Sequence, residues 1–184
     1  MSHKRDVIVY TIIIIVPILL LAGFVLFTPP QQPVVVHSKS IKLLSQVNGS
    51  AQFPQISTMG DKVYVVWQYN NPANPNTTIT FIENRINRLE NLSNSNGTSS
   101  DPQIAASDSN VYVVWKDNST GNDDIYFSKG TNNGSRFRDR DERNLSNNTG
   151  TSSDPQIAAS DNNVYVVWKD NSTGNDDIYL RRLR

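Results

Sequence analysis

The chain has 184 residues and a formal net charge of zero, because 17 lysines and arginines balance 17 aspartates and glutamates. This balance excludes a strongly basic nucleic-acid-binding protein and an acidic solvating tail. The absence of cysteine excludes disulfide frameworks, thiolate metal sites and cysteine nucleophiles. The histidines, His3 and His37, flank an apolar N-terminal segment, so the remainder of the chain cannot build a histidine-based catalytic cluster.

Residues 7–27 form a run of 21 residues without a charge. As a helix rising 1.5 Å per residue, such a run spans about 31 Å, enough to cross a hydrocarbon core of roughly 30 Å. The alternative is a cleaved signal peptide, whose apolar region usually has only about 7–15 residues. Leu21-Ala22-Gly23 offers a weak cleavage site, but the apolar run continues through Phe27. The sequence therefore predicts an uncleaved transmembrane anchor in the membrane lipid, preceded by a short tail at residues 1–6.

The flanking charges predict the orientation of this anchor. Lys4 and Arg5 precede it directly, which favours a cytoplasmic N-terminus under the positive-inside rule. We therefore expect a single-pass protein of the cell membrane whose C-terminal domain is extracellular, held off the surface by a Pro-rich stalk at residues 28–40. Sequons for N-glycosylation agree with an exterior location. They occur at Asn48, Asn76, Asn91, Asn96, Asn118, Asn133, Asn144, Asn147 and Asn171.

Internal repetition dominates the remaining residues, 41–184. Residues 98–127 and 151–180 are identical at 28 of 30 positions, with an offset of 53 residues. A fainter first copy lies 48 residues upstream, where residues 54–56 and 63–67 match the same pattern. A Leu-Ser pair also lies nine residues before a proline in each copy, at residues 44–45, 92–93 and 145–146. The sequence thus predicts three tandem units, at about 41–92, 93–145 and 146–184.

Each unit has the pattern of a small antiparallel sheet. Residues 111–115 are β-branched or aromatic and apolar on both faces, which is typical of a strand in a sheet covered on both sides. Shorter strands are predicted at 103–107, 124–129 and 143–146, separated by polar turns. Four antiparallel strands in every 50 or so residues describe a propeller blade. The predicted fold is therefore all-β, with three four-stranded propeller-like blades behind the transmembrane helix.

The repeated motifs resemble the sialidase-like (BNR/Asp-box) propellers, especially those of archaeal surface proteins. The resemblance is carried by Ser-Asp-Pro-Gln-Ile-Ala-Ala, Val-Tyr-Val-Val-Trp and Gly-Asn-x-Asp-Ile-Tyr. A degenerate Asp box lies at residues 130–137, where Asn132 stands for the aspartate and Gly134 and Phe137 are kept. Gly130 and Arg136 depart from the motif. The first copy lacks the box.

Counting strands leads to a hypothesis about assembly. Residues 41–45 are equivalent to a fourth strand and residues 177–184 to a third, so the three blades are cut as in a circularly closed propeller. Propellers typically have four to eight blades, and the resemblance implies six. We therefore expect a homodimer in which each N-terminal strand finishes the partner's last blade. The alternatives are an open three-blade fragment and a remnant of a longer gene.

The resemblance also implies an enzyme to be weighed. Sialidases use an arginine triad, a Tyr–Glu nucleophile pair and an aspartate acid/base. The arginines and glutamates of the repeat region all lie late in their units, away from the inner strand. They are Arg85, Arg88, Arg136, Arg138, Arg140, Arg143, Arg181, Arg182 and Arg184, with Glu83, Glu90 and Glu142. We therefore nominate no catalytic residue, and a sialidase-like glycoside hydrolase of the exo-alpha-sialidase type, or a truncated remnant of one, remains the alternative.

Repeated carboxylates and tryptophans are the other candidates for a site. Calcium takes six to eight oxygen ligands, yet the spacing differs from an EF-hand and Asp near Gly is an ordinary turn former. The carboxylates are Asp117, Asp123, Asp124, Asp170, Asp176 and Asp177. We expect neither a cofactor nor a metal, with Ca²⁺ as the alternative.

The tryptophans at 67, 115 and 168 end buried strands, so packing between blades is favoured over a sugar-binding platform. The Arg-rich segment 136–143 alternates with acidic residues, which is typical of a solvated loop rather than a nucleic-acid site. The sequence predicts a non-catalytic surface module with a binding or structural role. Its expected partners are glycans or proteins of the cell envelope, or its own copies.

Overall fold

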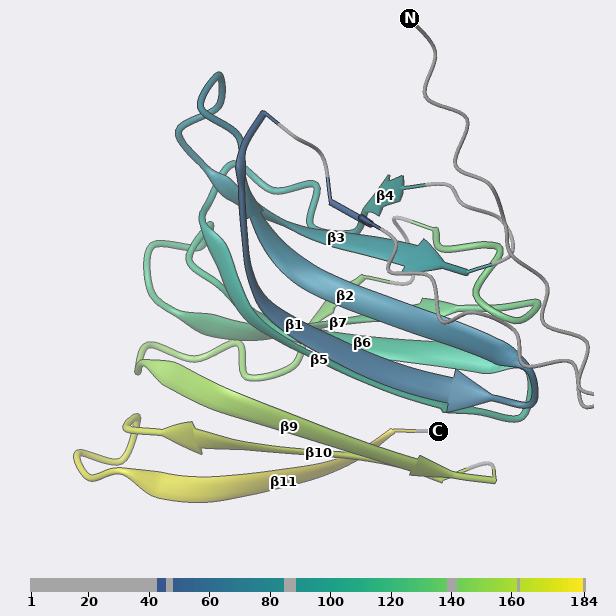
Figure 1. Cartoon of the computed structure of the whole chain (residues 1–184). Helices are drawn as coiled ribbons and strands as arrows, with labels where there is room; N and C mark the ends of the chain where they lie inside the picture. The colour runs from purple at the N-terminus through teal and green to yellow at the C-terminus, as the bar shows by residue number, and fades with distance from the viewer. Residues whose placement is uncertain (1–42, 46–47, 85–88, 139–141, 162, 184) are drawn as a thin grey trace, which may run out of the picture. The chain divides into compact units, whose positions relative to one another are not determined.

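The structure, a computed structural model, describes residues 43–45, 48–84, 89–138, 142–161 and 163–183 (Figure 1). All of them belong to one compact unit, Lys42–Arg184. The predicted tail, transmembrane helix and stalk at residues 1–40 lie outside the described residues. Within the described ranges the chain forms strands and turns only, and it has no helix of the length and apolar character needed to span a membrane.

The described strands form three antiparallel sheets, each built from consecutive strands. The first contains β1 (Ser50–Met59), β2 (Lys62–Asn70), β3 (Thr77–Glu83) and β4 (Leu89–Asn91). The second contains β5 (Ser99–Ser107), β6 (Asn110–Asp117), β7 (Asp124–Gly130) and β8 (Arg143–Asn144). The third contains β9 (Ser152–Ser160), β10 (Asn163–Asp170) and β11 (Asp177–Leu183). An all-β fold of three blade-like sheets is thereby confirmed, and the third sheet has three strands among the described residues, in keeping with the prediction that residues 177–184 are equivalent to a third strand.

The inner strand of each blade is longer than predicted because it contains a bulge. β5 begins at Ser99, four residues before the predicted start, and its pairing with β6 shifts register between Ser100 and Gln103. At this point Asp101 takes a left-handed φ of 53° ahead of Pro102. The bulge accommodates a proline that has no N–H for the ladder. Asp154 in β9 and Phe53 in β1 repeat this conformation, with φ of 53° and 51°.

The fourth strand is shorter than predicted because a Leu-Ser pair replaces its end. In the second blade, Leu145 N donates to Ile125 O at 2.7 Å and Ile125 N donates to Ser146 Oγ at 2.9 Å. Both residues therefore bind the start of β7 outside the β7–β8 ladder. We call this arrangement the Leu-Ser clasp.

The first blade contains an equivalent Leu-Ser clasp. Leu92 N donates to Ile79 O and Ile79 N donates to Ser93 Oγ, both at 2.8 Å. The earlier Leu-Ser pair, Leu44 and Ser45, was predicted within a fourth-strand equivalent at 41–45. Residues 43–45 form no strand, and residues 41–42 lie outside the described ranges.

The blades stack in chain order, with the inner strands β1, β5 and β9 side by side (Figure 1). Each blade has a tyrosine face and a tryptophan face, named after one central-strand residue on each side. The tyrosine faces comprise Tyr64, Val66, Ile79 and Phe81; Tyr112, Val114, Ile125 and Phe127; and Tyr165, Val167, Ile178 and Leu180. The tryptophan faces comprise Val63, Val65 and Trp67; Val111, Val113 and Trp115; and Val164, Val166 and Trp168.

Both blade–blade interfaces join a tyrosine face to the next tryptophan face. The tyrosine face of the first blade shares one buried cluster with Val111, Val113 and Trp115 of the second. The tyrosine face of the second blade shares another with Val164, Val166 and Trp168 of the third. Trp115 and Trp168 therefore pack between blades, as predicted, whereas Trp67 packs only within its own blade and beside Leu44 among the described residues. The stacking explains the apolar pattern on both sides of the second blade's central strand.

Candidate functional site

The repeated carboxylates predicted as alternative Ca²⁺ ligands are hydrogen-bond acceptors inside the blades. Asp117 is fully buried and accepts hydrogen bonds from Ser95 Oγ at 2.7 Å and Ser99 Oγ at 2.6 Å. Its other oxygen accepts the Ser119 N–H at 2.9 Å. A buried carboxylate with this many donors stabilises the turn that follows the central strand. Asp117 thus joins the turn to the preceding inner strand.

Asp124 is also buried and is held in the same way at the start of β7. It accepts hydrogen bonds from Thr120 Oγ1 at 2.7 Å and from Asn144 Nδ2 and Ser146 Oγ, both at 2.8 Å. The equivalent Asp177 is exposed and accepts a hydrogen bond from Thr173 Oγ1. The described part of the chain contains no group of three or more histidine, cysteine or acidic side chains that could hold a metal ion.

The third blade repeats the buried carboxylate at Asp170. Burial alone raises the pKa of Asp170, but hydrogen bonds from Ser152, Ser172 and Asn148 outweigh it and hold the pKa well below its usual range. Ser152 Oγ donates at 2.6 Å and Asn148 Nδ2 at 2.8 Å. Asp170 is therefore ionised in the folded chain and acts as a structural anchor.

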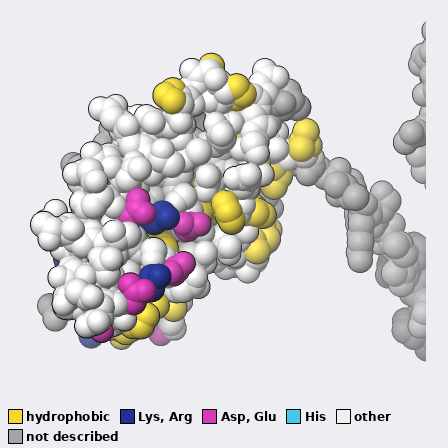
Figure 2. Space-filling view, turned by 90° about the vertical axis from the view of Figure 1, so that its left-hand side faces the viewer, with side chains coloured by type: hydrophobic (Ala, Val, Ile, Leu, Met, Phe, Trp, Pro, Cys, Tyr) yellow, Lys and Arg dark blue, Asp and Glu magenta, His cyan; other side chains and the backbone are white. Residues whose placement is uncertain are grey.

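Two groups of ion pairs lie on one face of the second and third blades, and Figure 2 shows two such groups of acidic and basic side chains. Lys116 Nζ lies 3.4 Å from Asp101 and 3.5 Å from Asp123. Lys169 Nζ lies 3.7 Å from Asp154 and 3.6 Å from Asp176. These side chains are partly or largely exposed, so the pairs contribute little to stability. Asp123 and Asp176, the remaining carboxylates considered as Ca²⁺ ligands, are therefore engaged in ion pairs with lysine.

The degenerate Asp box closes the first blade–blade interface. Phe137 packs edge-on against Phe81, with ring centroids 4.9 Å apart, and its ring lies against Gly130, where a Cβ atom would meet it at 2.5 Å. Gly134 has φ of 74° and lies close to Val111 and Phe81. Asn132, at φ of 51°, forms the turn between them. All four box residues therefore have a structural position in the stack.

The sequons lie on turns and strand ends. Asn48, Asn91, Asn96, Asn118, Asn147 and Asn171 are exposed, and Asn76, Asn133 and Asn144 are half-buried. Asn118 and Asn171 each accept a hydrogen bond through Oδ1, from the N–H of Thr98 and Thr151. Their glycosylation stays a prediction.

Several groups that a sialidase-like reaction needs have structural contacts instead. Tyr126 stacks on Trp115 and Tyr179 on Trp168, with centroids 6.2 and 5.9 Å apart. Arg143 lies over the Phe127 ring at 5.2 Å. Glu83 is buried, with 2% of its surface exposed. These contacts hold each group in packing within its own blade, and no catalytic residue is nominated.

The two ends of the stack have exposed apolar faces, as expected of an open three-blade fragment, and the sequence pattern did not identify their residues. On the tyrosine face of the third blade, Ile178 is 76% exposed and Leu180 is 66% exposed. Tyr165 on the same face is 39% exposed. The equivalent side chains in the second blade, Ile125 and Phe127, are 0% and 1% exposed. Apolar side chains that are core in one blade are therefore surface in another.

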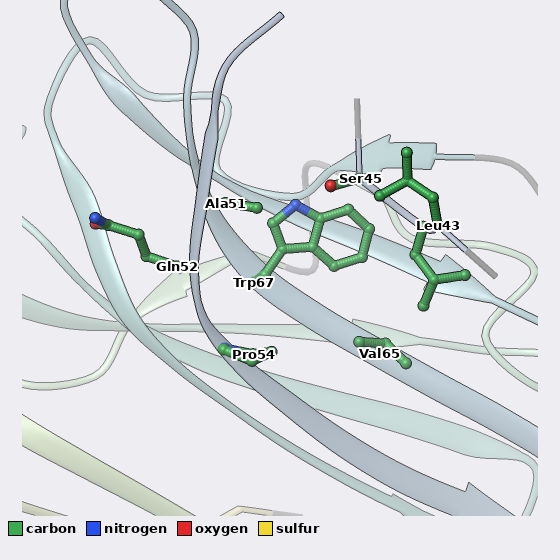
Figure 3. Close-up of a pocket in the computed structure, with 8 residues that line it drawn as sticks. Leu43, Ser45, Ala51, Gln52, Pro54, Val65 and Trp67 are labelled. Atoms are coloured by element: carbon green, nitrogen blue, oxygen red, sulfur yellow. The ribbon is translucent and has the colours of Figure 1, made fainter. Parts of the chain in front are cut away.

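The opposite end of the stack has an apolar pocket of about 280 Å³ on the tryptophan face of the first blade. Figure 3 shows the Trp67 indole between Leu43 and Ser45 on one side and the β1 residues on the other. The pocket is lined by Leu43, Leu44, Ser45, Ala51, Gln52, Pro54, Val65 and Trp67. Leu43 is 68% exposed, and Ile56 on the neighbouring part of β1 is 66% exposed. The indole Nε1 of Trp67 is buried and has no hydrogen-bond partner among the described residues.

Comparison with known proteins gives one kind of similarity only. No family model matches the chain, and no curated protein matches it. A similar solved structure is Bacteroides ovatus Xyloglucan PUL GH43B, at 16% sequence identity and a TM-score of 0.45. The match covers 73% of this chain and 31% of that chain, so this chain spans less than a third of its length. The resemblance to sialidase-like repeats finds no support in these comparisons and stays a prediction.

Proposed function

We propose that the chain is a membrane-anchored, extracellular blade module that acts by binding, in a structural role, and catalyses no reaction. The observation that carries this proposal is the pair of apolar end faces, on which Ile178, Leu180 and Ile56 each expose about two thirds or more of their surface. Contiguous exposed apolar side chains are typical of protein-binding surfaces. Proteins of the cell envelope are therefore the favoured class of partner, ahead of glycans.

The polar residues support the same proposal. The buried repeated carboxylates, Asp117, Asp124 and Asp170, accept two or more hydrogen bonds each from side chains of their own or neighbouring segments. Groups used in this way stabilise turns and are not poised to transfer protons. Residues 7–27 supply the anchor, and the sequons supply sites for glycans in an exterior location.

Location is tested by labelling single cysteines in the otherwise cysteine-free chain. Cells that express the full chain with Asn175→Cys, an exposed turn position, are treated with a membrane-impermeant maleimide. We expect labelling in intact cells. The matched control, Ser2→Cys in the predicted cytoplasmic tail, is labelled only after lysis. The reverse pattern contradicts the proposed orientation, and recovery of Asn175→Cys in the soluble fraction contradicts the anchor.

The catalytic alternative is tested by turnover. The full chain is incubated with fluorogenic glycosides that include a sialoside, and we expect no release of the fluorophore above the rate without protein. Turnover that is lost on Tyr126→Phe or Tyr179→Phe, with the fold retained, overturns the non-catalytic role in favour of the sialidase-like hydrolase.

A further inference from the structure

We infer that the two end faces bind each other between two copies of this chain. The tyrosine face of the third blade in one copy packs on the tryptophan face of the first blade in the other. This inference rests on the proposed function, which places binding at the end faces, and it adds the identity of the partner. Three independent features of the structure support it.

The first feature is that the contact between a tyrosine face and a tryptophan face already occurs twice inside the chain. Tyr64, Ile79 and Phe81 are at most 2% exposed because the tryptophan face of the second blade covers them. Their equivalents Tyr112, Ile125 and Phe127 are at most 5% exposed against the third blade. Tyr165, Ile178 and Leu180 are the same positions of the repeat, and no tryptophan face lies against them in the described part of the chain. The first blade supplies the one tryptophan face that has no tyrosine face against it in the described stack.

The second feature is the match between a protruding side chain and a pocket. In the first interface, Ile79 belongs to the same buried cluster as Leu92, Val113 and Trp115. The equivalents of those three residues at the end of the stack are Leu44, Val65 and Trp67, and all three line the pocket. The equivalent of Ile79 in the third blade is Ile178. The repeat therefore places Ile178 of one copy in the Trp67 pocket of the other.

The third feature is a Leu-Ser clasp that is only half formed. In each complete clasp, the leucine packs with the tryptophan of the following blade, as Leu92 does with Trp115 and Leu145 with Trp168. The same leucine and its serine hydrogen-bond an isoleucine of the preceding blade. Leu44 already packs against the cluster that contains Trp67, so its contact with the following blade is made. Leu44 has no preceding blade in the described stack, and we infer that the third blade of a second copy takes that place.

The clasp also predicts the hydrogen bonds of the new interface. By analogy with both complete clasps, Leu44 N donates to Ile178 O of the other copy, and Ile178 N donates to Ser45 Oγ. Ser146 Oγ also donates to the buried Asp124 at 2.8 Å, so Ser45 Oγ is expected to donate to the exposed Asp177. Asp177 is exposed, whereas its equivalent Asp124 is only 1% exposed. This difference agrees with an interface that a single chain leaves uncovered at Asp177.

The number of copies follows from the number of blades. A head-to-tail contact between unlike faces either closes into a ring or grows into an open chain. Propellers typically close with four to eight blades. Since the described residues of one copy form three blades, two copies of this stack give six blades, which falls in this range. The inferred assembly is a closed pair in which both contacts are identical.

Cross-linking of the full chain in mild detergent tests the contact. Two single-cysteine chains are made, Ser45→Cys and Ile178→Cys, and each is treated with a short bis-maleimide alone and after mixing. Because the closed pair brings Ser45 of one copy to Ile178 of the other, we expect a covalent pair in the mixture and at least tenfold less in either chain alone. Ser135→Cys, on an exposed turn of the middle blade, replaces Ser45→Cys in the control mixture.

Equal cross-linking in the control mixture, or in either chain alone, overturns the contact, and so does its absence from the test mixture. Circular dichroism of each variant confirms that the blades are folded before cross-linking. The outcome is separate from the test of the proposed function. Cross-linking in detergent reports which faces meet and is independent of cellular location, whereas maleimide labelling of intact cells reports location and is independent of dimerisation.

Discussion

Asp170 shows at the scale of a single residue how the repeat uses its polar side chains. Its carboxylate is fully buried, and Ser152, Ser172 and Asn148 donate to it. Charge-assisted hydrogen bonds of this kind are stronger than those between neutral groups. The same residue that a pattern of acidic side chains offers as a metal ligand is therefore an internal acceptor that joins a turn to an inner strand.

Replacement of Asp170 tests this anchor. Because its pKa is depressed in the folded state, the carboxylate contributes stability above its unfolded pKa of about 3.9, and this contribution is lost as the pH falls toward the folded pKa. We expect Asp170→Asn to cost about 2–3 kcal/mol at pH 7 and to flatten the loss of stability below pH 4. Urea unfolding of the full chain between pH 2 and 7 measures both effects. Asp161→Asn, at an exposed turn, is the control, and equal costs for the two variants contradict the anchor.

Phe53 is the residue least suited to its backbone. It takes φ of 51° at the position where the other two blades have aspartate, and its side chain is 54% exposed. The left-handed region costs an ordinary L-residue roughly 1–2 kcal/mol, and Asn and Asp tolerate it best. The first blade therefore carries local strain that the second and third blades relieve with aspartate.

We expect Phe53→Asn to raise the free energy of unfolding by about 1 kcal/mol, because asparagine relieves the left-handed strain. Thermal or urea unfolding of the full chain measures the change. Phe53→Leu removes the exposed ring but keeps a residue unsuited to this conformation, so it should give no gain. If leucine stabilises as much as asparagine, the strain is not the cause.

At the scale of the element, the Leu-Ser clasp connects each blade to the next, by hydrogen bonds to the preceding blade and apolar packing against the following one. Ser93 is 1% exposed, and its hydroxyl accepts the Ile79 N–H that would otherwise be buried without a partner. An unpaired buried donor costs about 1–3 kcal/mol. The clasp thus gives the start of β3, where β4 does not reach, a hydrogen-bond partner from one side chain, and it leaves the leucine beside the next tryptophan.

A serine-to-alanine series separates the complete clasps from the open one. In a chain made monomeric by Ile178→Asp, we expect Ser93→Ala to cost about 1–3 kcal/mol of unfolding free energy, because it leaves Ile79 N unpaired. Ser45→Ala should cost less than about 0.5 kcal/mol there, as expected of a surface position whose partner is absent. Without Ile178→Asp, Ser45→Ala should weaken the pair. Equal costs for Ser93→Ala and Ser45→Ala in the monomer contradict the account.

The sequence was sufficient to predict where most strands lie, but not the residues at which they begin and end. The Val-Tyr-Val-Val-Trp run predicts β6 because its composition favours a doubly covered strand. β5 starts before its predicted start at Gln103, since the left-handed Asp101 that lets the strand continue past Pro102 leaves no mark in the apolar pattern. Leu145 was predicted within a strand, because alternation cannot show that the neighbouring Ser146 uses its side chain in place of a backbone group.

At the scale of the whole molecule, identical residues differ in environment because of their place in the stack. Ile125 and Ile178 belong to segments that match at 28 of 30 positions, yet one is 0% and the other 76% exposed. No local pattern can therefore predict the end faces, whereas the homodimer hypothesis drawn from the strand count remains open to test. Complete burial of Ile178 or Leu180 is worth about 1.5–3 kcal/mol for each side chain, which gives the head-to-tail contact its expected driving force.

The most direct test of this account is the mass of the full chain in mild detergent at micromolar concentration, corrected for bound detergent. The account predicts about twice the chain mass of 20.6 kDa for the unaltered chain. It predicts a single chain mass for Ile178→Asp, which buries a charge in the Trp67 pocket, and the double mass again for Ile178→Leu, which conserves volume. An unaltered chain that is monomeric or forms longer assemblies, or an Ile178→Asp chain that remains paired, contradicts the closed pair.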